Sequence, residues 1–183
     1  MSTIVEALRA DHVNIAQVIR IAEQALTSLE AGETIDYSLL EDIMRYMTGY
    51  PDTHHHPLED VVFDRLKNRS PDLAPELDVI LAEHERIIST GRRFLAVVEA
   101  AEEDAMLERA KMVALGRDYL SLLTKHMNNE EGRFFPAAEA SLTDSDWDSV
   151  REQFEHRPDP LFGRSLEEEY RSLWKLIQLH KPQ

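Results

Sequence analysis

The sequence predicts an all-α protein: an up-down-up-down four-helix bundle followed by two additional C-terminal helical segments. Apolar residues recur at helical spacing over four long stretches, and short polar, glycine-containing or proline-containing breaks separate these stretches. No stretch shows the alternating pattern of a half-buried strand. We expect a bundle over residues 1–138 and a helical extension over residues 139–183 that packs on the bundle or on a partner subunit.

Composition limits the classes of function. A chain of 183 residues can bury a core of its own. It has neither a basic, apolar leader nor an apolar run of bilayer length, so we expect a cytoplasmic protein without a membrane partner. The absence of cysteine excludes disulfides and thiolate-held clusters, and a net charge of -15 argues against nucleic acid as a partner.

The first predicted helix spans residues 3–30. His12 lies in its apolar stripe, and Asp11 beside it is either an outer partner of that histidine or a solvent-facing residue. The break at residues 31–36 ends this helix.

The second helical stretch begins near Tyr37. Gly49 and Pro51 are expected to bend or interrupt it, and an apolar face then continues to Leu66.

Three consecutive histidines, residues 54–56, lie inside this second stretch. On a helix, His55 and Glu59 share one face, where an imidazole and a carboxylate can reach one metal ion or bridge two. His54 is expected to be more exposed. His56 is closer to a usable position, although the proline after it restricts its backbone.

The third helix follows a break at residues 68–72 and carries His84 within its apolar stripe. Glu83 and Glu85 flank this histidine in sequence, and we expect both to point away from the stripe.

The fourth helix follows an acidic break at residues 101–105. Its apolar face ends in His126 and Glu130, which repeat the spacing of His55 and Glu59. In the extension, Thr143 or Asp144 is expected to cap a helix through Phe154, and a last helix is expected from residue 166 to about residue 180.

The spacing of four histidines predicts that they meet. In an antiparallel bundle, residues at the same height lie symmetrically about the connecting loop. The midpoint is 33.5 for His12 and His55, 69.5 for His55 and His84, and 105 for His84 and His126. Each midpoint falls in a predicted break, so the four imidazoles are expected at one level of the core.

Two glutamates are expected at the same level, one turn beyond their histidines. Ionised and unpaired in an apolar core, they would cost several kcal/mol, and a dinuclear metal site removes that cost. Imidazole and carboxylate donors suit iron, manganese or zinc. The predicted metal ligands are His12, His55, Glu59, His84, His126 and Glu130.

A ferritin-like site is disfavoured. Such sites need a glutamate three residues before a histidine on two of the helices. Here Asp52, Leu81 and Leu123 stand three residues before His55, His84 and His126.

The motifs resemble those of the hemerythrin family in its bacterial form with the HHE cation-binding domain. The resemblance covers about residues 3–138 and rests on three segments, which are residues 55–60, 83–85 and 126–136. It implies two non-haem iron ions held by the four histidines, with Glu59 and Glu130 as bridges and a solvent-derived oxo or hydroxo bridge.

This sequence departs from the oxygen carriers of that family in one respect. The oxygen carriers resemble this pattern but have a second histidine one turn from the third-helix ligand. Ile80 and Ile88 occupy those positions here, so the fifth histidine is missing unless His56 substitutes for it. The pattern looks closer to the iron-centre repair proteins, which have four histidines and two glutamates. Those usually carry a cysteine-containing N-terminal domain that this sequence lacks.

Three hypotheses about function follow. The leading one is a non-haem diiron protein that binds or senses iron, dioxygen or nitric oxide, with a small gaseous or peroxide ligand as partner. The second is a diiron redox enzyme that reduces peroxide or nitric oxide, or an iron donor for iron-centre repair. The third is a metal-stabilised interaction module that forms oligomers through its C-terminal helices. Four aromatic residues either shield the site, as the second hypothesis requires, or simply belong to the core. They are Phe63, Tyr119, Phe134 and Phe135.

Overall fold

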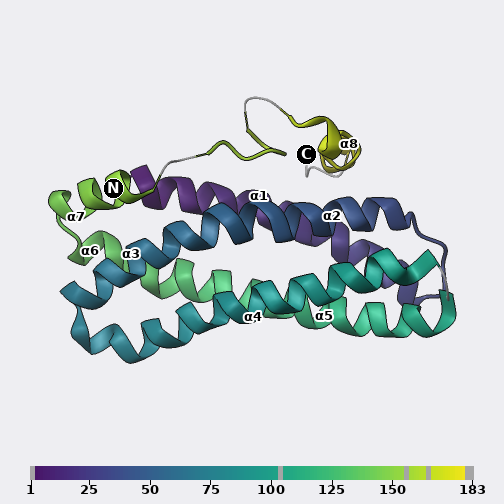
Figure 1. Cartoon of the computed structure of the whole chain (residues 1–183), viewed down its shortest axis with the longest axis horizontal. Coiled ribbons are helices and arrows are strands. Elements are labelled where there is room, and N and C mark those ends of the chain that lie inside the picture. Colours follow the sequence, from purple (N-terminus) through teal and green to yellow (C-terminus); the bar gives the residue numbers. More distant parts are fainter. Residues whose placement is uncertain (1–2, 103–104, 155–156, 164–165, 180–183) are drawn as a thin grey trace.

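The computed structural model describes residues 3–102, 105–154, 157–163 and 166–179. The part of the chain within these ranges contains helices and turns but no strand, which confirms the predicted all-α class. Long helices run side by side along one axis, and the C-terminal segment lies across one side of them (Figure 1).

The bundle has four arms, two of which consist of two helices in line. Helix α1 and helix α4 are single arms, whereas α2 continues into α3 and α5 continues into α6 (Figure 1). The bounds are α1 Thr3–Glu30, α2 Tyr37–Tyr50, α3 His56–Arg69, α4 Ala74–Glu99, α5 Ala105–Asn129 and α6 Phe135–Ser141. The acidic break before α5 includes residues 103 and 104, which lie outside the described residues.

Both composite arms contain a π-helical turn at the joint, at Pro51–His55 and at Glu130–Phe134. A proline follows two residues after each turn, at Pro57 and Pro136. A proline in a helix removes one hydrogen bond and crowds the carbonyl four residues before it, and a wider turn relieves that crowding. The interruption expected at Gly49 and Pro51 is therefore a local widening, and the arm continues through it.

The extension folds back onto the bundle. Helix α7, Asp144–Gln153, packs on α3 and begins with a capping box in which Thr143 and Asp146 bond to each other's backbone. Helix α8, Arg171–Leu179, packs on α1 and α2 (Figure 1). A short 3-10 turn precedes α8, so the last helix starts later than the sequence pattern predicts, and its expected end at residue 180 lies outside the described residues.

A buried hydrogen bond fixes the turn before α8. The hydroxyl of Tyr46 in α2 donates to Asp159 Oδ2 at 2.9 Å. The other carboxylate oxygen of Asp159 accepts from the backbone N–H groups of Leu161 and Phe162 at 2.8 and 2.9 Å. Burial, and then the Asp159 carboxylate, raises the pKa of Tyr46, so its hydroxyl remains a donor.

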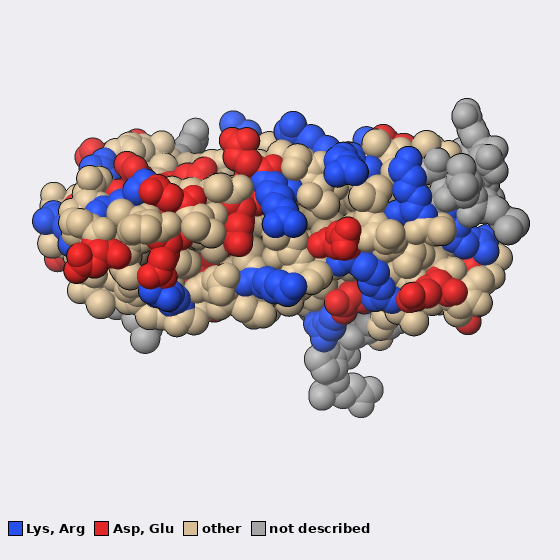
Figure 2. Space-filling view, turned by 90° about the horizontal axis from the view of Figure 1, so that it is seen from below, with Lys and Arg blue, Asp and Glu red and all other residues tan. Residues whose placement is uncertain are grey.

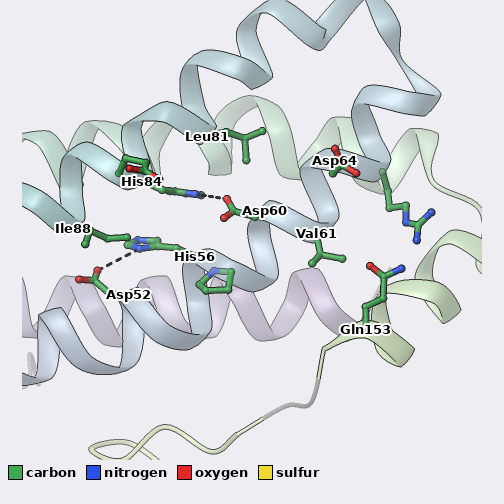
Figure 3. A pocket seen from close by; sticks show the side chains of 12 residues that line it. Asp52, His56, Asp60, Val61, Asp64, Leu81, His84, Ile88 and Gln153 are labelled. Carbon is green, nitrogen blue, oxygen red and sulfur yellow. Dashed lines mark hydrogen bonds and ion pairs between the residues drawn. The ribbon is translucent and has the colours of Figure 1, made fainter.

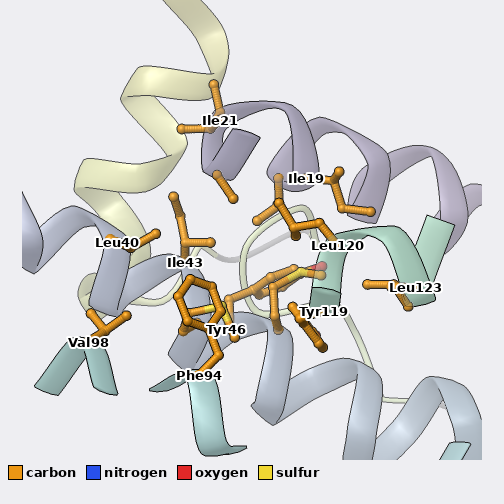
Figure 4. Close-up of a cluster of buried hydrophobic side chains, with 14 of the residues drawn as sticks. Ile19, Ile21, Leu40, Ile43, Tyr46, Phe94, Val98, Tyr119, Leu120 and Leu123 are labelled. Carbon is orange, nitrogen blue, oxygen red and sulfur yellow. The ribbon is translucent and has the colours of Figure 1, made fainter. Parts of the chain in front are cut away.

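The apolar core is divided into two clusters. One lies toward the loop between α1 and α2 and includes Ile15, Tyr46, Phe94 and Tyr119 (Figure 4). The other lies toward α6 and α7, and its members include Leu8, Val62, Phe63, Ile80, Phe135 and Trp147. On each arm a polar layer separates residues of the first cluster from residues of the second.

On the face drawn in Figure 2, lysine and arginine side chains lie among acidic ones rather than in one continuous patch. Within the described ranges, no helix combines the length and the apolar character needed to cross a bilayer.

We predict that Gly116→Ala destabilises the fold by about 1–3 kcal/mol, because overpacking a dense core forces side chains to shift. A Cβ atom at Gly116 would lie 2.7 Å from Leu26 Cδ1 and 2.7 Å from Phe94 Cζ. Gly132→Ala is the control, since its Cβ would have no neighbour within 4 Å. Urea unfolding measures both variants, and a Gly116→Ala variant as stable as Gly132→Ala would contradict the packing described.

Candidate metal centre

The structure brings together all six side chains that the sequence singled out. Each arm contributes at least one of them, and all six are buried, with Glu59 and Glu130 completely so. The six are His12 of α1, His55 of the first π turn, Glu59 of α3, His84 of α4, His126 of α5 and Glu130 of the second π turn. They form the polar layer between the two apolar clusters.

Glu59 faces histidines on both sides of the centre. Its Oε1 lies 3.1 Å from His55 Nε2 and 3.4 Å from His12 Nε2. Its Oε2 lies 3.4 Å from His84 Nε2. One oxygen of Glu59 is therefore directed to the side of His12 and His55, and the other to the side of His84.

Glu130 repeats this arrangement from the opposite arm. Its Oε1 lies 3.1 Å from His126 Nε2 and 3.6 Å from His84 Nε2, while its Oε2 lies 3.5 Å from His12 Nε2. Together the two carboxylates define a first position beside His12 and His55 and a second position beside His84 and His126. This is the arrangement that two bridging carboxylates need.

The atoms at the middle of this layer have no hydrogen-bond partner within the described part of the chain. Buried polar groups are normally paired, and an unpaired buried carboxylate is costly. The atoms concerned are Nε2 of His12, His84 and His126 and both carboxylate oxygens of Glu59 and of Glu130. Imidazole nitrogens and carboxylate oxygens turned toward one another fit a cation between them, so the residues present suit a metal centre.

Outer carboxylates face the other nitrogen of each imidazole. His12 Nδ1 lies 2.8 Å from Glu131 Oε1, and His84 Nδ1 lies 2.6 Å from Asp60 Oδ1. Such partners hold the Nδ1–H tautomer and direct the Nε2 lone pair inward. The role of Glu131 and Asp60 as partners of these histidines was not predicted from the sequence, although each directly follows a predicted glutamate ligand.

Two further outer carboxylates correct the sequence-based expectations. Glu83 was expected to point away from the stripe, but its Oε2 lies 3.1 Å from His126 Nδ1. Asp11 was considered as a partner of its neighbour His12, but its Oδ2 lies 3.2 Å from His55 Nδ1. A carboxylate just outside the stripe of one helix reaches the histidine of the next helix, which a single-helix projection does not show.

The remaining two histidines of the triple motif differ in burial. His54 is half-buried, and its ring stacks on Tyr50 with centroids 5.7 Å apart. His56 is 2% exposed, and its ring stacks on His84 with centroids 4.6 Å apart.

The four aromatic residues that the sequence offered as a shield divide into two groups. Phe135 stacks on the His12 imidazole with centroids 5.3 Å apart and also contacts Phe63. Phe134 contacts Phe63 as well. Tyr119 belongs to the other cluster, beside Phe94, and is a core residue.

Without a cation, protons are the only positive charges available to the two glutamates. Burial lowers the pKa of His12, but Glu130 and Glu59 outweigh it and raise that pKa to about 10. Against the same effect of burial, Glu59 and Asp11 raise the pKa of His55 to about 9. For His84, burial is again outweighed, and Asp60, Glu130 and Glu59 raise the pKa to about 12.

The glutamates shift in the opposite direction. Burial raises the pKa of Glu59, but His55, His12 and His84 hold it well below its usual value. Burial and Glu59 raise the pKa of Glu130, and the neighbouring histidines hold it below its usual value. Both carboxylates therefore stay ionised, and a metal ion that binds has to displace protons from His12, His55 and His84.

A surface pocket of about 510 Å³ adjoins the second position. His56 and His84 line its inner side, next to the carboxylates of Asp52 and Asp60 that face them (Figure 3). The pocket therefore brings the surface of the protein next to the histidines of α3 and α4.

We predict that the metal-free protein is most stable between about pH 4.5 and pH 6.5, the unperturbed values for glutamate and histidine. The raised histidine pKa values contribute stability that is present below pH 6.5 and is lost as the pH rises through about 9 to about 12. The lowered glutamate pKa values contribute stability that is present above about 4.5 and is lost at lower pH. Urea unfolding across this range, with metal-loaded protein as control, tests this. A flat profile for the metal-free protein from pH 6.5 to pH 10 would contradict it.

We predict that Asp60→Asn weakens metal binding by about 10- to 100-fold, because it removes the carboxylate that orients His84. Asp64→Asn is the matched control, since Asp64 lines the same pocket without contacting the imidazole. Competition with a chelator measures both affinities. Equal affinities in the two variants would show that Asp60 does not support the site.

A comparison with models of protein families identifies the family of this chain. The model of the family described as Hemerythrin HHE cation binding domain matches residues 3–138, which includes all six candidate ligands. No curated protein matches the chain. Because the family match covers most of the chain, as the resemblance of its motifs implied, this protein belongs to the hemerythrin HHE cation-binding domain family.

Proposed function

We propose that this protein is a non-haem diiron protein that binds or senses iron, dioxygen or nitric oxide. The observation that carries the proposal is the pair of fully buried glutamates, each with one oxygen toward His12 and the other toward His84. Two separate single-ion sites would not need two carboxylates that both span the centre.

The donor set supports iron as the metal. Four imidazoles and two carboxylates, with no thiolate available in the sequence, suit iron, manganese or zinc. The matched family is described as cation-binding, and the resemblance of the motifs to hemerythrins implies iron. When bound, an iron pair supplies one-electron redox chemistry and coordination positions for a small ligand.

The residues around the centre have separate roles in this function. The outer carboxylates hold the Nδ1 protons of the histidines and keep their Nε2 atoms directed inward. Phe135 packs against the His12 side of the centre, while the surface pocket lies beside His84. A small gaseous or peroxide ligand would enter from that side.

A diiron redox enzyme is the second candidate, and the pocket is the observation that favours it. A volume of about 510 Å³ exceeds what a diatomic ligand needs, and a substrate or reductant could occupy it. Reduction of peroxide or nitric oxide with an added electron donor distinguishes this candidate from reversible binding.

We predict two iron ions per chain in protein loaded anaerobically with ferrous iron, measured by metal analysis. On oxidation, a near-ultraviolet absorption band of a coupled ferric pair should appear. Glu59→Gln should bind fewer than two iron ions, because it removes a charge whose two oxygens lie beside His55 and His84. Glu85→Gln, an exposed glutamate beside His84, is the control.

Exposure of the reduced protein to dioxygen or nitric oxide then tests the ligand. A spectral change that reverses when the gas is removed supports binding or sensing, and sustained turnover of peroxide or nitric oxide supports the enzyme. One zinc ion per chain, or no metal at all, would rule out both.

A further inference from the structure

His56 occupies a place at the centre that the six predicted ligands leave unexplained. It begins α3 directly after His55, and its imidazole is turned into the core rather than to solvent. Its ring stacks on His84, with centroids 4.6 Å apart, and meets His126 edge-on at 5.9 Å. A third imidazole therefore lies on the side of the centre that His84 and His126 form.

The ligand atoms are close enough to share one ion. His56, Glu59, His84 and His126 each offer a nitrogen or oxygen, and these atoms all lie within 4.8 Å of one another. His12, His55 and Glu59 form the corresponding group on the other side. Glu59 belongs to both groups, as a residue between two ions should.

The surroundings of His56 repeat those of the other four histidines. Its Nδ1 lies 3.5 Å from Asp52 Oδ1, so every one of the five imidazoles has a carboxylate of its own beside Nδ1. The Asp52 side chain is 3% exposed, and neither of its oxygens nor His56 Nδ1 has a hydrogen-bond partner among the described residues. Asp52 therefore stands to His56 as the outer carboxylates stand to the other four imidazoles.

The π turn explains why a residue next to His55 can also reach the centre. In a regular α-helix, consecutive residues point about 100° apart, so His55 and His56 would not share a face. The turn Pro51–His55 is wider than an α-turn and ends directly before His56. His55 is thereby directed to His12, and His56 to His84 (Figure 3).

We propose that His56 is a fifth imidazole ligand, so that His56, His84 and His126 hold one ion and His12 and His55 hold the other. This inference rests on the proposed metal centre and deepens it, because it makes the two positions unequal. The ion at the second position, which adjoins the pocket, has more protein ligands than the ion beside His12. Asp52 is the positioning residue for the fifth imidazole.

Cobalt(II) alone is a suitable probe, because it does not depend on iron redox chemistry. Full-length wild-type protein titrated with Co²⁺ should bind two ions per chain. Its paramagnetically shifted proton spectrum should contain five solvent-exchangeable imidazole N–H signals, one for each coordinated histidine. Four such signals, or no uptake of Co²⁺, would overturn the inference without the need for any variant.

His56→Gln should remove one of these signals and weaken the binding of one of the two Co²⁺ ions by about tenfold or more. His54→Gln is the matched control, because it changes the first histidine of the same motif. The ring of His54 stacks on Tyr50 and not on His84. A His56→Gln variant that binds Co²⁺ like His54→Gln would overturn the inference. If Co²⁺ gives five signals but iron gives no coupled ferric pair, the assignment of His56 stands and the proposed diiron function fails.

Discussion

The structure depends on two ionised carboxylates placed in the middle of an apolar core. Glu59 and Glu130 are completely buried, and imidazole nitrogens from all four arms lie 3.1 to 3.4 Å from their oxygens. Removing two such charges from water is costly, and imidazoles compensate only when they carry protons or when a cation lies between them. The arms must therefore meet at one height, and the two apolar clusters must end on either side of that layer.

The two π turns direct side chains of the composite arms into this buried layer. Each composite arm widens where it supplies a histidine or a glutamate to the centre, and each has a proline two residues after the wide turn. Widened turns are frequent at functional sites because they change the direction of a side chain without ending the helix. Here the turn at Pro51–His55 places two consecutive histidines at the centre, a result that a regular helix does not give.

The outer carboxylates hold the histidines of the centre in one orientation. A histidine whose Nδ1 faces a carboxylate keeps one tautomer and one orientation, which is what a metal ligand needs. Asp11, Asp60, Glu83 and Glu131 contribute this effect across helix interfaces, so the packing of the bundle and the geometry of the centre support each other. The extension adds its own constraint through Tyr46 and Asp159, a buried hydrogen bond that joins α2 to the segment before α8.

The sequence by itself determined the helical class, the breaks and the six candidate ligands, because helical periodicity and spacing about the loops are local properties of the chain. It did not determine the partners of the histidines, since Glu83 was expected to face away and Asp11 was considered for the wrong imidazole. Only the tertiary structure decided these, because they depend on how far one helix is rotated against the next. The sequence offered His56 as a possible fifth histidine, but only the structure shows the wide turn before α3 that directs it to His84, because regular helical spacing puts consecutive residues about 100° apart.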